Sequence, residues 1–381
     1  KIHAEILGNA GEGYRLQHRI SLREQFLHYL QKVGRGHSDA VPRGRGKSGI
    51  AEKFTAERSC SIMRKTGLHT KGNWYKGNLH THSTNSDGRK TPEEIVRIYR
   101  EHGYQFLAFT EHEFYTHNRE LTGEDFLILP GVELSCNNPD PWRIYHMLGI
   151  GRHAAGDELS SGNGFSDRQR FPVRKWKDLG SVQSALDEIR NAGCLAVFNH
   201  PIWSRLELTD FIDLDGYSAM EIYNYGCAVE SHTGLCIDYW DSLLRRGRKI
   251  WGIATDDAHF ALEDYCGGWV MVNAPELTIE AVTSALAEGN FYSSSGPEIY
   301  RYEAEDGVVK VDCSDAREIH FVTYESFGNS LFARSGECLT HGEFRLSGEE
   351  LYVRVEVVDH SGRTAWSNPI FLNEKTPGGY M

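Results

Sequence analysis

Short apolar segments alternate with capped helical segments through the middle of the chain. A proline and a glutamate follow the capping threonine in TPEE (91–94), and a glycine closes each of three other helical segments. Nearly continuous apolar strands between helices favour a parallel sheet covered by helices, hence an α/β barrel or a doubly wound sheet. The predicted strands are 105–110, 126–130, 144–150, 194–200, 219–224, 249–255 and 268–272.

The pattern changes after residue 295, where the helical signal stops. EIHFVTY (318–324) and LYVRVEVVD (351–359) alternate apolar and polar residues between turns. A period of two is typical of strands that bury one face, so a small antiparallel β domain, a sandwich, is predicted here. The expected domains are a basic N-terminal extension, partly helical or flexible, over 1–71, an α/β domain over 72–295 and a β-sandwich domain over 296–381.

Charge is unevenly distributed along the chain, whose formal net charge is −12. Residues 1–72 carry 14 Lys+Arg against 6 Asp+Glu, whereas the remainder carries 27 against 47. We interpret the basic arm first as a solvated extension, with a nucleic-acid tether as the less favoured alternative. The acidic body argues against a broad DNA-binding face.

The cysteines and the apolar runs of the sequence indicate the cellular compartment in which the protein is expected. The 8 cysteines form no Cys-x-x-Cys pair, which favours reduced, mostly buried thiols. No run approaches the roughly 18 apolar residues of a membrane span, and the first residues lack a secretory-signal pattern. We therefore expect a cytoplasmic protein without a membrane partner, and the sequence does not indicate its oligomeric state.

Imidazoles and carboxylates gather at the ends of the predicted strands. In an α/β barrel the carboxyl ends of the strands meet at one mouth, so side chains there become neighbours. The period of two places both imidazoles of His80-Thr-His82 on one face of a strand. His146 lies within a strand, which leaves a structural role equally open. The groups at or just beyond strand ends are His80, His82, Asp87, His112, Glu133, His200, Asp256, Asp257 and His259.

These side chains are typical metal ligands, and no thiolate joins them. Histidine and carboxylate sets bind Zn²⁺, Mn²⁺ and Fe²⁺. The set is larger than one tetrahedral ion requires, so two or three ions that share a bridging carboxylate are expected. Ions placed close together lower the pKa of a bound water and neutralise charge on the substrate, which indicates hydrolysis. We interpret the other histidines as structural or solvated.

Six motifs resemble, in order, those of the PHP (polymerase and histidinol phosphatase) superfamily of metal-dependent hydrolases. They are NLHTHSTNSDG, FTEH, GVEL, YHMLG, FNHP and DDAH, between residues 78 and 259. WYKGNLHTHS, GNFYSSSGPEI and WSNPI are similar to segments of its carbamate-hydrolase-like branch, whose members carry a C-terminal β domain. The resemblance covers about 72–375. It implies a distorted (β/α)₇ barrel that holds two or three divalent ions.

The resemblance also implies individual roles. His80, His82 and Asp257 would bind the first ion, with Asp256 as a competing carboxylate for the role of Asp257. Glu133 would be the bridging carboxylate. The remaining positions implied as ligands or near-ligands are His112 and His200 for the second ion, Asp87, and His146 and His259 for a third ion or for substrate. Glu111, Glu113 and Glu221 would be supporting or structural.

We expect a metal-dependent phosphoesterase in which a metal-bridged hydroxide attacks a small phosphoester. His259 or His200 would donate a proton to the leaving oxygen, and Asp87 would assist. Arg205 and Arg143 are candidate phosphate clamps, although each fits a solvated surface residue as well. Hydrolysis of a carbamate, amide or ester at the same metal site is the main alternative. A phosphoesterase acting on nucleic-acid ends is a further, less favoured one.

Overall fold

The structure is a computed structural model that describes residues 64–69, 71–139, 142–153 and 164–373. The chain divides into two compact units, 1–58 and 59–381, and all described residues lie in the second. The predicted N-terminal extension therefore lies outside the described residues up to residue 63. Its last part is described: β1 (Lys65–Thr66) pairs with β14 (Ile299–Glu305) of the β domain.

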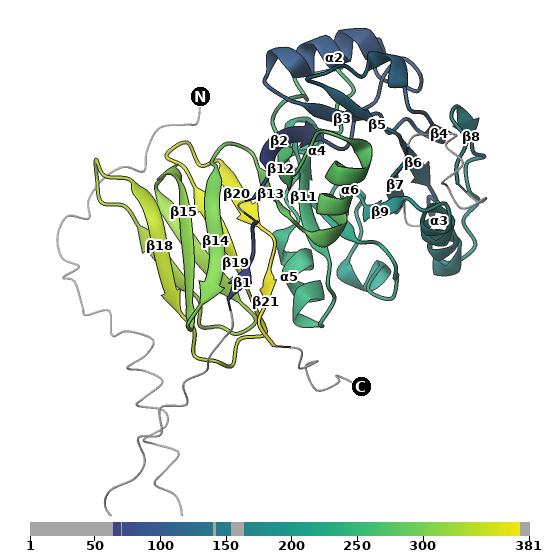
Figure 1. Cartoon of the computed structure of the whole chain (residues 1–381). Helices are drawn as coiled ribbons and strands as arrows, with labels where there is room; N and C mark the ends of the chain where they lie inside the picture. The colour runs from purple at the N-terminus through teal and green to yellow at the C-terminus, as the bar shows by residue number, and fades with distance from the viewer. Residues whose placement is uncertain (1–63, 70, 140–141, 154–163, 374–381) are drawn as a thin grey trace, which may run out of the picture. The chain divides into compact units, whose positions relative to one another are not determined.

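The α/β part follows the predicted alternation closely (Figure 1). Six of the seven predicted strands contain an observed one, and the seventh, 268–272, overlaps the strand Trp269–Ala274. The capping box predicted at Thr91 is present, with its hydroxyl accepting from Glu94 N. The elements in chain order are β2 (Asn73–Asn78), α2 (Pro92–Glu101), β3 (Phe106–Ala108), β4 (Phe114–Tyr115), η1 (Arg119–Leu121), β5 (Leu127–Leu129), β6 (Gly131–Ser135), β7 (His146–Ile150), β8 (Gln169–Arg170), α3 (Leu179–Asn191), β9 (Leu195–Phe198), η2 (Leu208–Asp210), β10 (Ala219–Asn224), α4 (Tyr225–Ser231), α5 (Ile237–Arg245), β11 (Trp251–Thr255), β12 (Trp269–Ala274), α6 (Ile279–Glu288) and β13 (Phe291–Ser294).

Strand direction corrects the expectation of a parallel sheet. β2, β3 and β5 are parallel to one another, as are β9, β10 and β11. β7, however, is antiparallel to both β6 and β9. The reason is the connection: no helix separates β6 from β7, and a chain that turns back directly produces an antiparallel neighbour. The prediction of a parallel sheet was therefore wrong at β7, and it was also wrong at β12, which is antiparallel to β2.

Two sheets carry the α/β part. One has the strand order β11-β10-β9-β7-β6, and β12-β2-β3-β5 form part of the other. Isolated bridges join Thr81 to Ala258 and His112 to Glu133, at the carboxyl ends of β2, β11 and β3. Among the described residues the ladders do not close into a ring, so the architecture is a mixed α/β fold.

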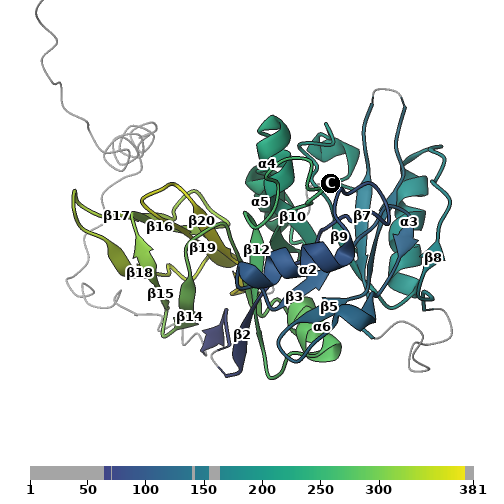
Figure 2. The same cartoon turned by 90° about the horizontal axis from the view of Figure 1, so that it is seen from above.

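The β domain shares a sheet with the α/β part (Figure 2). β20 pairs with β13, so one ladder runs from the β domain into β12 and β2. A second sheet of the order β1-β14-β15-β18 packs against it around the buried side chains of Tyr302, Val311 and Val355. The remaining strands are β15 (Val308–Ala316), β16 (Glu318–Thr323), β17 (Asn329–Phe332), β18 (Leu339–Arg345), β19 (Tyr352–Val358), β20 (Thr364–Ser367) and β21 (Ile370–Phe371).

The helices bury apolar faces against the sheets. Ile95, Val96 and Tyr99 of α2 are buried, as are Leu243 and Leu244 of α5. Apolar spacing of three and four residues places these side chains on one helical face, which explains both helices. None of the helices in the described part has the length and apolarity needed to cross a membrane.

Candidate metal centre

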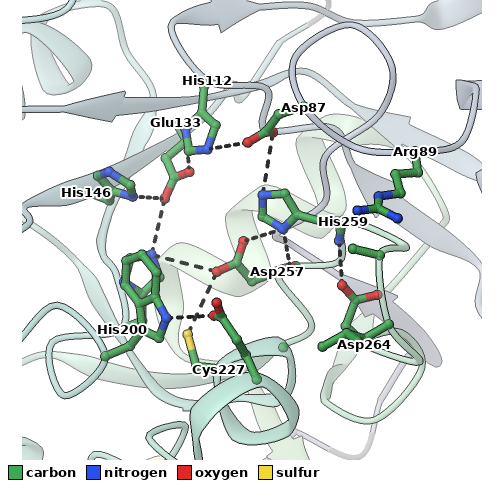
Figure 3. Close-up of a pocket in the computed structure, with 15 residues that line it drawn as sticks. Asp87, Arg89, His112, Glu133, His146, His200, Cys227, Asp257, His259 and Asp264 are labelled. Carbon is green, nitrogen blue, oxygen red and sulfur yellow. Dashed lines mark hydrogen bonds and ion pairs between the residues drawn. The ribbon is translucent and has the colours of Figure 1, made fainter.

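The nine residues predicted as metal ligands come together in the structure (Figure 3). They form four overlapping groups in which the ligand atoms of each group lie within 4.8 Å of one another. The residues come from the carboxyl ends of β2, β3, β9 and β11 and from β6 and β7. The groups are His80, His82 and Asp257; His80, Glu133 and His200; His112, Glu133 and His146; and His82, Asp87, His112 and His259. We call these nine residues the metal cluster.

His80, His82 and Asp257 are held together by their backbones. Asp257 N donates to His80 O at 2.9 Å, and His82 N donates to Ala258 O at 3.0 Å. The loop after β11 is thereby fixed to the end of β2. Asp257 Oδ1 lies 3.1 Å from His80 Nε2 and 3.2 Å from His82 Nε2. Asp257 also adopts a positive φ of 53°, a costly conformation of the kind found at functional sites.

Glu133 lies at the centre of the metal cluster and is 1% exposed. Its Oε1 lies 3.2 to 3.4 Å from nitrogens of His80, His146 and His200. Its Oε2 lies 3.1 Å from His112 Nδ1 and 3.4 Å from His82 Nε2. Burial raises the pKa of Glu133, but the surrounding imidazoles, His146 and His80 first, hold it well below its usual range. A carboxylate with imidazoles on both oxygens has the placement of a bridging ligand.

Asp87, His112 and His259 form the more accessible side of the metal cluster. Asp87 is 55% exposed at its side chain and lies 3.5 Å from His259 Nε2 and 3.6 Å from His112 Nε2. Burial lowers the pKa of both histidines, but Glu133 beside His112 and Asp87 beside His259 raise each to about 9. These carboxylates therefore favour a positive charge at the ring nitrogens of His112 and His259. Either a proton or a metal cation bound to the ring can provide that positive charge.

Several buried side-chain atoms in the described residues lack a hydrogen-bond partner, and three of them lie together in the metal cluster. These three are His80 Nε2, His82 Nε2 and Glu133 Oε2. A buried polar atom without a partner costs about 1–3 kcal/mol, so three in one place require an explanation. Imidazole nitrogens and a carboxylate oxygen are donors that divalent Zn²⁺, Mn²⁺ and Fe²⁺ accept. The residues present therefore fit a metal centre.

The opposite ring nitrogens are held by residues outside the metal cluster. His80 Nδ1 lies 2.7 Å from Glu221 Oε1, and His200 Nδ1 lies 3.0 Å from Ser204 Oγ. Such partners fix the orientation of a metal-binding imidazole. Glu221 also accepts from Thr255 Oγ1 at 2.7 Å, so its carboxylate is tied to β11. Sequence reasoning placed Glu221 on its strand but slightly favoured a structural role.

Asp256 does not face the metal cluster. Its carboxylate accepts from Tyr99 Oη and from the backbone N–H groups of Cys266, Gly267 and Gly268, at 2.8 to 2.9 Å. Complete burial raises the pKa of Asp256 to about 6, although these hydrogen bonds oppose the rise. Asp256 therefore holds the loop at 266–268, and the geometry favours Asp257 over Asp256 as a ligand.

The neighbours of His112 also support the site. Glu111 accepts from Ser83 N at 3.0 Å and from Ser86 Oγ at 2.5 Å, which fixes the turn that carries Asp87. Glu113 accepts from Ser135 N at 3.0 Å. Both carboxylates point away from the metal cluster and bind the chain on either side of it.

The two arginines predicted as phosphate clamps lie elsewhere. The cavity at the metal cluster has a volume of about 360 Å³, and neither Arg143 nor Arg205 is among its lining residues. Arg143 Nε instead pairs with Asp210 Oδ2 at 2.8 Å, and Arg205 is exposed. Arg89 lines the cavity in their place. Its position directly after the SDG of the first motif was the available signal, and sequence reasoning missed it.

Comparison with known proteins adds one curated relative. No family model matches the chain. Phosphoribosyl 1,2-cyclic phosphate 1,2-diphosphodiesterase of Eggerthella lenta is 32% identical over 130 residues, which cover 31% of this chain and 49% of the relative. The chain thus spans about half the length of the curated relative that it matches.

Solved structures that match this chain do so at low sequence identity and low TM-score. A two-domain protein with a predicted PHP-like metal-dependent phosphoesterase, from Bacteroides vulgatus, is 16% identical with a TM-score of 0.39, covering 83% of this chain and 100% of its own. An amidohydrolase from Chromobacterium violaceum is 16% identical with a TM-score of 0.39, covering 56% and 96%. The curated relative is by its name a phosphodiesterase, and the match to it stands beside the resemblance of the six ordered motifs to those of the PHP superfamily.

Proposed function

We propose that this protein is a metal-dependent phosphoesterase that acts on small phosphoesters. The observation that carries the proposal is the convergence of His80 Nε2, His82 Nε2 and Glu133 Oε2, all buried and without hydrogen-bond partners among the described residues. The name of the curated relative, a diphosphodiesterase, supports the phosphoester as substrate. The cavity of about 360 Å³ suits a small molecule better than a polymer.

The metal cluster divides into ligand sets. His80, His82 and Asp257 would hold one ion, and Glu133 would bridge it to a second ion held by His112 and His200. Asp87, His146 and His259 would complete a third site or contact the substrate. When bound, divalent ions supply an activated water and neutralise charge on phosphoryl oxygens.

Two histidines are placed to move a proton. His259 Nδ1 is tied to Asp257 O at 2.9 Å, so Nε2 is the free nitrogen toward the cavity, where Asp87 lies 3.5 Å away. His259 is 30% exposed at its side chain and can reach a leaving oxygen. His200, tied to Ser204 through Nδ1, presents Nε2 in the same way. We assign His259 as the principal proton donor and Asp87 as the group that orients His259. His200 is the second candidate donor, and only as an alternative to binding the second ion, because both roles use Nε2.

We also propose that the α/β part is a distorted (β/α)₇ barrel. The bridges Thr81–Ala258 and His112–Glu133 support it, because they connect the two sheets at the ends that carry the metal cluster. The proposed boundary with the β domain remains at 295/296, and β13 on one side pairs with β20 on the other.

The function is tested by comparing three substrates under identical conditions. The metal-loaded full chain is assayed on p-nitrophenyl phosphate, on a bis-phosphodiester and on an aryl carbamate, and kcat/KM values are compared. We expect a phosphoester to be preferred. Preference for the carbamate would replace the proposal with the carbamate, amide or ester alternative, and turnover confined to nucleic-acid ends would favour the nucleic-acid alternative.

A further inference from the structure

The cavity has two chemically different ends outside the metal cluster. Arg89 lies at one end, and Figure 3 shows Arg89 and His200 on opposite sides of Asp257. Trp203 belongs to the His200 end, since its ring centroid lies 5.0 Å from that of His200. Glu230 lies beside Trp203 and accepts from its indole N–H at 2.8 Å. One end is therefore cationic, and the other is aromatic and acidic.

Arg89 is fixed at its backbone but free at its guanidinium. Arg89 N donates to His259 O at 2.9 Å, and Gly88 N donates to Ser83 O at 2.9 Å. A Cβ on Gly88 would lie 2.3 Å from His82 O, so only glycine permits this close turn. The residue is thus attached directly to two segments that carry the metal cluster. No described residue forms an ion pair or hydrogen bond with the Arg89 side chain.

Two acidic residues that line the cavity with Arg89, Asp264 and Asp87, already have partners. Asp264 uses Oδ2 to accept from His259 N and Oδ1 to accept from Phe260 N, each at 3.0 Å. Asp87 faces the imidazoles of His112 and His259. Arg89 is the one lysine or arginine among the described residues that line the cavity. Its charge is therefore available to a bound anion.

The opposite end would repel a second anion. Glu230 is exposed there and carries negative charge, and Trp203 offers a ring that stacks or packs against apolar groups. A substrate with a second charge would therefore bind with that charge toward Arg89.

We infer that Arg89 is a specificity-determining residue that selects small phosphoesters carrying a second anionic group, a carboxylate or a phosphate. The inference rests on the proposed function, because it assumes that the ester itself binds at the metal cluster. The guanidinium fork matches either anion with two parallel hydrogen bonds. The aromatic end then accepts the uncharged remainder of the molecule.

Binding of non-hydrolysable probes tests the inference without turnover. Dissociation constants of phenylphosphonate, 4-carboxyphenylphosphonate and 1,4-phenylenebisphosphonate are measured by calorimetry on the Mn²⁺-loaded full chain. We expect the two doubly charged probes to bind about tenfold more tightly than phenylphosphonate, as expected for a hydrogen-bonded charge. Their relative affinities distinguish a carboxylate from a phosphate as the preferred second anion.

Variants test whether Arg89 causes the preference for doubly charged probes. Arg89→Met is expected to reduce the tenfold ratio to about one, and Arg89→Lys to retain part of it. Arg97→Met, on the exposed face of α2, is the matched control and should keep the full ratio. Equal binding of all probes to the unaltered chain, an unchanged ratio in Arg89→Met, or an equal loss for every probe would each overturn the inference.

Failure of the inference and failure of the proposed function are distinguishable. Turnover of p-nitrophenyl phosphate without any preference among the phosphonates would remove the role of Arg89 and leave the phosphoesterase intact. A preference among the phosphonates without turnover of any phosphoester would remove the proposed reaction and leave Arg89 as an anion-binding residue.

Discussion

The metal cluster and a second group of charged residues both have charged or polar atoms that are buried, but these atoms find hydrogen-bond partners to different extents. The second group, which we call the Arg354 cluster, consists of Arg354 on β19, Asp241 on α5 and Glu356. Arg354 is 1% exposed and donates to both oxygens of Asp241 at 2.8 Å. The Arg354 cluster is complete within the chain, whereas the metal cluster leaves three buried atoms without partners among the described residues.

The difference separates a structural site from a binding site. A complete buried ion pair holds two elements together, here the β domain and α5, and requires nothing further. Buried atoms that lack partners cost free energy, and such a site persists where a ligand offsets that cost. Burial and charge alone would not show which of the two clusters binds a ligand. The presence or absence of hydrogen-bond partners for the buried atoms shows it.

The largest effect is expected from Glu133→Gln. The substitution removes the central negative charge from five imidazoles, so bound metal should be lost and phosphoester turnover should fall more than about a hundredfold, beyond the effect of an orienting residue. Metal content by elemental analysis and kcat/KM measure it. Glu101→Gln, exposed on α2, is the control. Full metal content with normal turnover in Glu133→Gln would contradict the assignment.

Arg354→Met should leave the metal cluster intact and reduce stability. Breaking a buried ion pair typically costs about 3–5 kcal/mol, because one charge stays buried without its partner. Urea unfolding measures the loss, and metal content should be unchanged. The double variant Arg354→Met/Asp241→Asn should recover part of the loss, since it removes the stranded carboxylate. A single variant as stable as the unaltered chain would show that the Arg354 cluster is dispensable.

Glu221→Gln should weaken the metal centre without abolishing it. Glu221 contacts the metal cluster through His80 Nδ1 and His200 N and so orients ligands, and residues in such a position are typically worth about 10- to 100-fold in metal affinity. Competition with a metal chelator measures the affinity. Loss of metal as complete as in Glu133→Gln would indicate that Glu221 is itself a ligand.

The smallest effect, and a pH-dependent one, is expected at Asp359 in the turn between β19 and β20. Burial raises its pKa, but the Arg363 and Ser361 N–H groups and the Arg363 guanidinium outweigh this and hold the pKa below 3.8. A lowered pKa stabilises the fold above the unfolded value and ceases to do so as pH falls through the folded value. Asp359→Asn should therefore cost about 1 kcal/mol at pH 7.

The pH series provides its own control. The difference in unfolding free energy between Asp359→Asn and the unaltered chain should stay constant down to about pH 5 and shrink below pH 4, as expected for a carboxyl group. Protonation of the metal cluster affects both proteins equally and cancels. A difference that grows on acidification would contradict the assigned direction of the pKa shift.

Strand positions were predictable because they depend on local pattern. β10 coincides with the predicted 219–224, and β3, β5 and β9 lie within their predicted segments. Strand direction was less predictable, because β7 turns back through a connection without a helix, and the apolar run of β7 carries no information about direction. Residues 64–69 were assigned to the extension because their pairing partner, β14, lies more than 200 residues away.

The sequence by itself indicated most of the side chains that meet in the metal cluster, because a period of two and the position at a strand end are local features. It left His146, which lies within β7, undecided. Only the tertiary structure decided which atoms face inward. Glu221, 141 residues from His80, turns the ring so that Nε2 faces Glu133. Asp256 and Asp257 are neighbours in sequence, yet hydrogen bonds from a later loop turn Asp256 away. Orientation depends on partners that are distant in the chain, and local pattern does not encode them.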